Sequence, residues 1–122
     1  MLNKILLVLA LLYTVALAVI SLLNSSNLPD INIDNSDKYG HAIAYSLLCL
    51  FWYLAMKSYK FSKALLTAAS IAIIYGIILE VLQGVLTDVR ISDGYDILAN
   101  CIGVVFISII ILIRNKTHVK NL

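Results

Sequence analysis

Four long apolar runs constrain this chain more than any other feature of its sequence. They have 19, 18, 23 and 17 residues and cover Ile5–Leu23, Tyr39–Met56, Ala64–Leu86 and Ile97–Ile113. A helix needs roughly 20 residues to cross the hydrocarbon core of a bilayer. Because a backbone in lipid must satisfy its own hydrogen bonds, each run predicts a transmembrane α-helix.

The composition supports lipid as the solvent for this fold. Apolar residues make up 61% of the 122 residues and charged residues only 13%, whereas about half of an average globular chain is apolar. The first run is longer than the apolar part of a signal peptide and no cleavage site follows it, so we expect it to remain as a helix. The predicted fold class is therefore all-α: a single four-helix transmembrane domain over residues 1–122, embedded in the membrane as a multi-pass protein.

The charged residues divide between the two ends of these runs. One end holds seven basic residues and no acidic one: Lys4, Lys57, Lys60, Lys63, Arg114, Lys116 and Lys120. The other end holds all seven acidic residues with only Lys38 and Arg90. Since Lys and Arg near helix ends favour the cytoplasm, both termini are predicted to be cytoplasmic and both acidic loops extracytoplasmic.

Polar residues gather at the predicted extracytoplasmic end of three helices. Helix-compatible spacings pair them on single faces, as Asp37 with His41, Glu80 with Gln83, and Asp96 with Asn100. Glu80 lies six residues, or about 9 Å, before the end of its run. A carboxylate at that depth is costly unless it faces a bundle interior or a watery cavity. We therefore expect these pairs to converge in a shared interior.

The predicted site consists of Asp37, Lys38, His41, Glu80, Gln83, Arg90, Asp96 and Asn100. Arg90 and His41 are the candidate partners of Glu80, and Arg90 is the preferred partner of the carboxylates because its guanidinium keeps its charge and offers five donors. Two alternatives stay open: the set is a buried structural network, and Asp37 and Asp93 act only as helix N-caps.

Several classes of chemistry find no support in the sequence. No paired-cysteine or His-Glu-x-x-His metal motif, phosphate-binding loop or nucleophile elbow occurs, so we expect no metal and no cofactor. Cys49 and Cys101 are interpreted as small packing residues. The basic residues mark topology, so nucleic acid is not an expected partner.

Two sequence blocks resemble the VanZ-like membrane family, which is named for a protein linked to teicoplanin resistance. The resemblance covers roughly residues 37–103. The matching positions, in "DKYGHAIAY" and in "EVLQGVLTDVRISDGYDILAN", are Asp37, Lys38, His41, Tyr45, Glu80, Gln83, Arg90, Asp96, Asn100 and Gly103. The chain departs from the family where Asp88-Val89 replaces a Pro-Gly and where Ile107 replaces a second glycine. The resemblance implies a protein of the bacterial cytoplasmic (inner) membrane, in some members tied to glycopeptide susceptibility.

Two functions from different classes remain. The preferred hypothesis is a non-enzymatic protein whose extracytoplasmic polar pocket binds the head group of an envelope lipid or cell-wall precursor. In the alternative, the chain is a membrane enzyme that modifies an envelope lipid, with Glu80 or His41 as acid or base. Four helices are few for a transporter.

Overall fold

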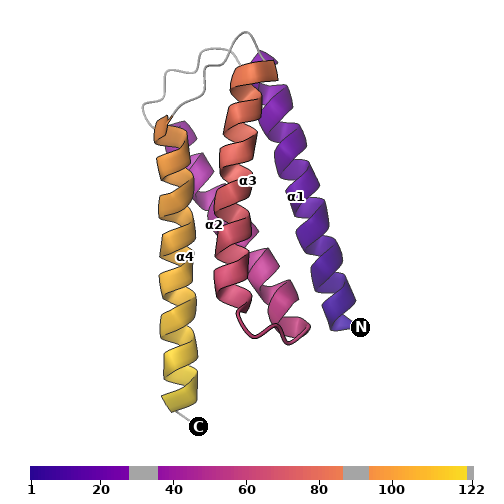
Figure 1. Cartoon of the computed structure of the whole chain (residues 1–122), viewed down its shortest axis with the longest axis vertical. Helices are drawn as coiled ribbons and strands as arrows, with labels where there is room; N and C mark the ends of the chain where they lie inside the picture. The colour runs from indigo at the N-terminus through magenta and orange to yellow at the C-terminus, as the bar shows by residue number, and fades with distance from the viewer. Residues whose placement is uncertain (28–35, 87–93, 121–122) are drawn as a thin grey trace.

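The computed structural model describes residues 1–27, 36–86 and 94–120, with the side chains of 23–27, 36–38, 86, 94 and 117–120 left out. The described chain forms four helices (Figure 1), namely α1 (Leu2–Asn27), α2 (Ser36–Ser58), α3 (Ala64–Leu86) and α4 (Gly94–Lys120). Each contains a segment that is long and apolar enough to cross a membrane. The all-α class with four helices of spanning length is thus confirmed and indicates a multi-pass membrane protein.

The apolar runs locate these helices better than they locate their ends. The third helix has the predicted bounds, whereas α1, α2 and α4 continue past their apolar runs at both ends. Helix α4 exceeds its run most, with 27 residues. Backbone i→i−4 hydrogen bonds continue wherever the chain keeps helical geometry, so polar residues that follow an apolar run extend a helix without changing its apolar length.

Successive helices run antiparallel, and α1 and α4 lie on the two flanks with α2 and α3 between them (Figure 1). Helix α2 packs against each of the other three helices and most extensively against α4. The N-terminus, the α2–α3 connection and the C-terminal part of α4 share one end of the bundle. The other end therefore holds the beginnings of α2 and α4 and the end of α3.

Small residues allow the helices to approach closely. The buried residues include Ala10, Ala55, Ala64, Ala68, Ala72 and Ala99. Between helices in lipid, association depends on close van der Waals packing and hydrogen bonds more than on apolar burial. Large apolar side chains are instead exposed on all four helices, as expected for a surface whose solvent is lipid.

Helix α1 is attached to its neighbours by side-chain hydrogen bonds. The Tyr13 hydroxyl donates to the Ala44 carbonyl at 2.6 Å. The Tyr75 hydroxyl donates to the Thr14 carbonyl at 2.6 Å, and Trp52 Nε1 donates to Thr14 Oγ1 at 2.9 Å. These contacts place the polar groups of aromatic side chains against partners on adjacent helices, where lipid offers none.

The short α2–α3 connection has a left-handed residue at its second position. Lys60 has a φ of 62°. The Lys60 amide donates to the Lys57 carbonyl at 2.9 Å, and the Phe61 amide donates to the Met56 carbonyl at 3.1 Å. This pair of bonds is a Schellman motif, which usually has glycine at the left-handed position. The motif ends α2 and turns the chain toward α3 within five residues.

Candidate functional site

Four polar side chains of α3 and α4 are almost completely buried. Glu80, Gln83, Asp96 and Asn100 are only 1–2% exposed. On α3 the neighbouring Val81 is half exposed, so the carboxylate faces the bundle and the apolar side chain faces outward. The 3.6-residue period of each helix turns both members of each pair inward, and the cost of a charge in lipid favours that orientation.

His41 connects α2 to the buried pair on α4. Its Nδ1 lies 3.1 Å from Asn100 Oδ1, and its Nε2 lies 3.9 Å from Asp96 Oδ2. Because an amide oxygen only accepts hydrogen bonds, Nδ1 is the donor in this arrangement. The second ring nitrogen then faces a carboxylate at a distance too long for a direct hydrogen bond. The imidazole is thus oriented by one amide and lies beside one carboxyl group.

The His41 side chain is also the most accessible part of this cluster. It is 18% exposed, whereas the Asp96 side chain is 1% exposed. The ring stacks with that of Tyr45 one turn later, with centroids 6.4 Å apart and planes 2° from parallel. A molecule that approaches the described part of the cluster from outside would meet His41 before either buried carboxylate.

Gln83 on α3 also contacts α1, through a hydrogen bond for which the sequence offers no signal. Gln83 Nε2 donates to the Ser21 carbonyl at 2.9 Å. This bond joins the polar face of α3 to α1. The acceptor is a backbone carbonyl, a group that every residue carries, so no residue type marks it. The sequence reasoning missed this contact.

Close packing between α2 and α4 fixes the distance from His41 to its partners. A Cβ on Gly103 would collide with the backbone of Ala42, with the carbonyl carbon at 2.8 Å. Ser46 Oγ lies 2.7 Å from the Ala42 carbonyl oxygen and 2.8 Å from the Gly103 carbonyl oxygen, so its single hydrogen can be donated to either acceptor, and the Gly103 contact joins α2 to α4. The crossing lies beside His41 on α2 and Asn100 on α4, so it positions the two side chains that meet.

A second glycine leaves room for the buried amide. A Cβ on Gly76 would lie 2.8 Å from Asn100 Nδ2 and 3.0 Å from Tyr45 Cε1. Gly76 therefore lets α3 approach the Asn100 and Tyr45 side chains closely. The family-like pattern includes Tyr45 and Gly103 but does not include Gly76 or Ser46.

The remaining sequence-predicted site residues are only partly placed. Asp37 and Lys38 lie in the first turn of α2, but their side chains are outside the described part. Arg90, and with it the predicted guanidinium partner of the carboxylates, lies outside the described residues. Asp93 lies there as well. Among the described residues, no group of three His, Cys, Asp or Glu side chains could hold a metal ion.

Together, His41 and the four buried polar side chains of α3 and α4 supply two carboxylates, one imidazole and two amides. Such a set can donate and accept hydrogen bonds, and it can move a proton at the imidazole. Glu80 and Asp96 are too buried to touch an outside molecule directly. Among these side chains His41 is therefore the accessible one, with Asn100 orienting its ring and Asp96 nearby.

Comparison of this chain with protein-family models, curated proteins and solved structures finds no match.

Proposed function

We propose that this chain is a VanZ-like protein of the bacterial cytoplasmic membrane, and that its polar cluster binds the head group of an envelope lipid or cell-wall precursor at the extracytoplasmic face. The observation that supports it most is the His41 side chain, partly exposed and held by Asn100 at 3.1 Å beside Asp96. A buried network without ligand would not require an accessible imidazole at its edge.

The proposed orientation follows from the charges. Seven basic residues occur at the end where both termini lie, so that end is assigned to the cytoplasm. The cluster then lies near the outer surface, where glycopeptide antibiotics meet cell-wall precursors. Asp37, Lys38 and Arg90 are proposed to complete the pocket, with the two cationic groups meeting a phosphate.

Binding can be tested with purified protein and a lipid-linked cell-wall precursor in detergent. We expect binding by the unmodified chain and a loss of at least tenfold in affinity for His41→Ala. His118→Ala is the matched control because it removes the only other histidine. Equal binding by all three proteins would contradict the role of His41.

The link to antibiotic susceptibility needs its own test. Expression of the chain in a susceptible Gram-positive host should raise the teicoplanin concentration that stops growth, and His41→Ala should abolish the rise. An unchanged inhibitory concentration with well-expressed protein would remove this part of the proposal and leave the binding measurement standing.

The orientation can be tested by labelling single cysteines from outside intact cells. In a background without Cys49 and Cys101, cysteines at positions 34 and 88 should react with a membrane-impermeant maleimide and a cysteine at position 60 should not. The opposite pattern would place the polar cluster at the cytoplasmic face.

The second candidate is an enzyme that modifies an envelope lipid, and the closeness of His41 to Asp96 supports it. An imidazole beside a carboxylate can act as a general acid or base. The burial of Glu80 favours His41 over Glu80 for that role. Lipid extracts from cells with and without the protein separate the two candidates. If a lipid species appears or disappears when the unmodified protein is present, and the lipids stay unchanged when His41→Asn is present, the protein is an enzyme.

A further inference from the structure

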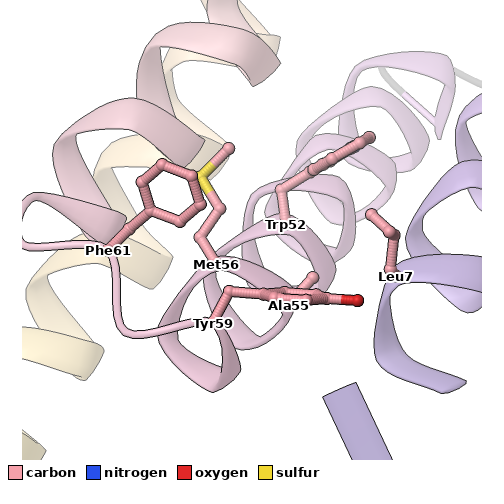
Figure 2. A pocket seen from close by; sticks show the side chains of 6 residues that line it. All are labelled: Leu7, Trp52, Ala55, Met56, Tyr59 and Phe61. Carbon is pink, nitrogen blue, oxygen red and sulfur yellow. The ribbon is translucent and has the colours of Figure 1, made fainter. Parts of the chain in front are cut away.

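Two hollows lie on α2 near the α2–α3 connection, at the end of the bundle opposite to the polar cluster. One is an apolar pocket of about 330 Å³ between α1 and α2. Figure 2 shows Leu7 facing Trp52 and Ala55 across it, with Phe61 beside Met56. The other hollow has a volume of about 210 Å³ and lies between α2 and α4. Its lining is chemically different and includes Tyr53, Lys57, Arg114 and Asn115.

The α2–α4 cleft brings together two cations and no carboxylate. Lys57 comes from the last turn of α2 and Arg114 from α4. Lys57 Nζ lies 5.6 Å from the centroid of the Tyr53 ring, within the range of a cation–π contact, which holds the ammonium at the cleft. Two positive charges that no acidic residue of the lining neutralises provide a site for an anion.

A buried hydroxyl adds a directed donor to the cleft. Tyr53 is only 6% exposed, and its hydroxyl oxygen accepts a hydrogen bond from Asn115 Nδ2 at 3.1 Å. A phenol has one hydrogen to donate as well as lone pairs to accept with. With the oxygen engaged by Asn115, the hydrogen of Tyr53 is left to be donated to an occupant.

The depth of the cleft distinguishes a lipid from a soluble anion. The segments of α2 and α4 that are long and apolar enough to cross a membrane end at Ser58 and Lys116, and Lys57 and Arg114 lie within three residues of these ends. These ends correspond to head-group level. Leu54 and Ile111, about one turn deeper on the same two helices, and Leu50, a further turn along α2, form the apolar part of the lining. A basic mouth above an apolar floor matches a phosphate attached to acyl chains.

We propose that this cleft is a binding site for the head group of an anionic glycerophospholipid. Arg114 and Lys57 contact the phosphodiester oxygens, with Arg114 able to bind two oxygens at once. The Tyr53 hydroxyl donates a third hydrogen bond, and the acyl chains leave along Leu54 and Ile111. Basic pockets between transmembrane helices are known to hold anionic lipid head groups. This site is independent of the function proposed for the polar cluster.

Native mass spectrometry of the full chain, titrated with phosphatidylglycerol or phosphatidylcholine in detergent, tests the proposal. We expect a saturable adduct of one phosphatidylglycerol and weaker binding of phosphatidylcholine. The double variant Lys57→Gln/Arg114→Gln should weaken phosphatidylglycerol binding about 30-fold, which is the loss of about 1 kcal/mol for each cation. Arg114→Lys should retain an intermediate affinity, because it keeps the charge and loses the two-oxygen contact.

The matched control is Lys60→Gln/Lys63→Gln, which removes the same net charge near the same end of the bundle but outside the cleft lining. We expect it to bind phosphatidylglycerol nearly as the unmodified chain does. Far-UV circular dichroism confirms that each variant keeps its helices. If the control and cleft variants lose affinity for phosphatidylglycerol equally, the lipid is held by diffuse charge attraction, and the proposed site is wrong. Displacement of the lipid by millimolar glycerol phosphate would show a site for soluble phosphate, and it too would overturn the proposal.

Discussion

Three glycines of this bundle should respond very differently to the same added methyl group. A Cβ on Gly40 of α2 would meet nothing within 4 Å. A Cβ on Gly76 would press on the side chains of Asn100 and Tyr45, and one on Gly103 would press on the backbone of Ala42. Substitution of each by alanine is therefore a graded test of how closely the helices approach one another.

The magnitude for Gly103→Ala follows from the α2–α4 distance. The added Cβ would lie 2.8 Å from the Ala42 carbonyl carbon, where an ordinary contact is 3.4–4 Å. The clashing atoms are backbone, so the helices themselves must separate by about 1 Å. A gap of that size forfeits a quarter to a half of each dispersion contact, and it lengthens the contact of Ser46 Oγ with the Gly103 carbonyl oxygen. Overpacking of a core typically costs about 1–3 kcal/mol, and we expect Gly103→Ala near the upper end.

The other two substitutions should both cost less than Gly103→Ala. Gly76→Ala should cost about 1–2 kcal/mol, because the atoms that it meets belong to side chains that can shift. Gly40→Ala should be neutral or stabilising by up to about 1 kcal/mol, since alanine favours helices more than glycine does. The expected order of stability is Gly40→Ala, the unmodified chain, Gly76→Ala and then Gly103→Ala.

Unfolding in mixed micelles of dodecylmaltoside and increasing SDS, followed by circular dichroism, measures these differences. Gly103→Ala should also weaken head-group binding at the polar cluster, because separation of α2 from α4 moves His41 away from Asn100. If Gly103→Ala and Gly40→Ala unfold at the same SDS fraction, the close crossing of α2 and α4 is wrong.

Three further predictions use the same unfolding assay. Tyr75→Phe should cost about 0.6 kcal/mol and at most about 1.7 kcal/mol, because it removes the bond to Thr14, while Tyr59→Phe, at an exposed residue just after the end of α2, should cost almost nothing. Lys60→Gly should stabilise by about 1 kcal/mol, since glycine adopts a positive φ without steric cost. Lys63→Gly should not stabilise, and equal effects of the two would refute the left-handed turn. Asn100→Leu should lower the free energy of unfolding by about 1–3 kcal/mol, because His41 Nδ1 loses its acceptor. A loss below about 0.5 kcal/mol would show that this bond is not formed.

The sequence predicts the helices well because apolar length is a local property. Each run of apolar residues specifies a spanning helix without reference to the rest of the chain. The bounds of α3 follow directly, whereas Lys120 at the end of α4 lies seven residues past the end of its apolar run. Hydropathy reports where lipid begins and ends, and the helix continues beyond that limit.

The candidate site is predicted less completely because it depends on how the helices meet. Spacing along one helix shows that Glu80 shares a face with Gln83. The cost of polar groups in lipid predicts that this face turns away from the lipid-facing surface of the bundle. Spacing does not show that His41 meets Asn100, which requires the crossing of α2 and α4. Gly40 and Gly103 are the same residue type, yet an added Cβ would meet a neighbouring helix at Gly103 and nothing within 4 Å at Gly40.

The chain contains one tryptophan, Trp52, and its indole N–H donates to Thr14 on α1. Because of this contact, the intrinsic fluorescence of Trp52 reports whether α1 is packed against α2. Indole emission depends on the polarity and hydrogen bonding around the ring, so detachment of α1 from α2 alters the signal without any attached dye. The docking of the first helix can therefore be followed in real time by intrinsic fluorescence, apart from the stability of the α2–α4 pair.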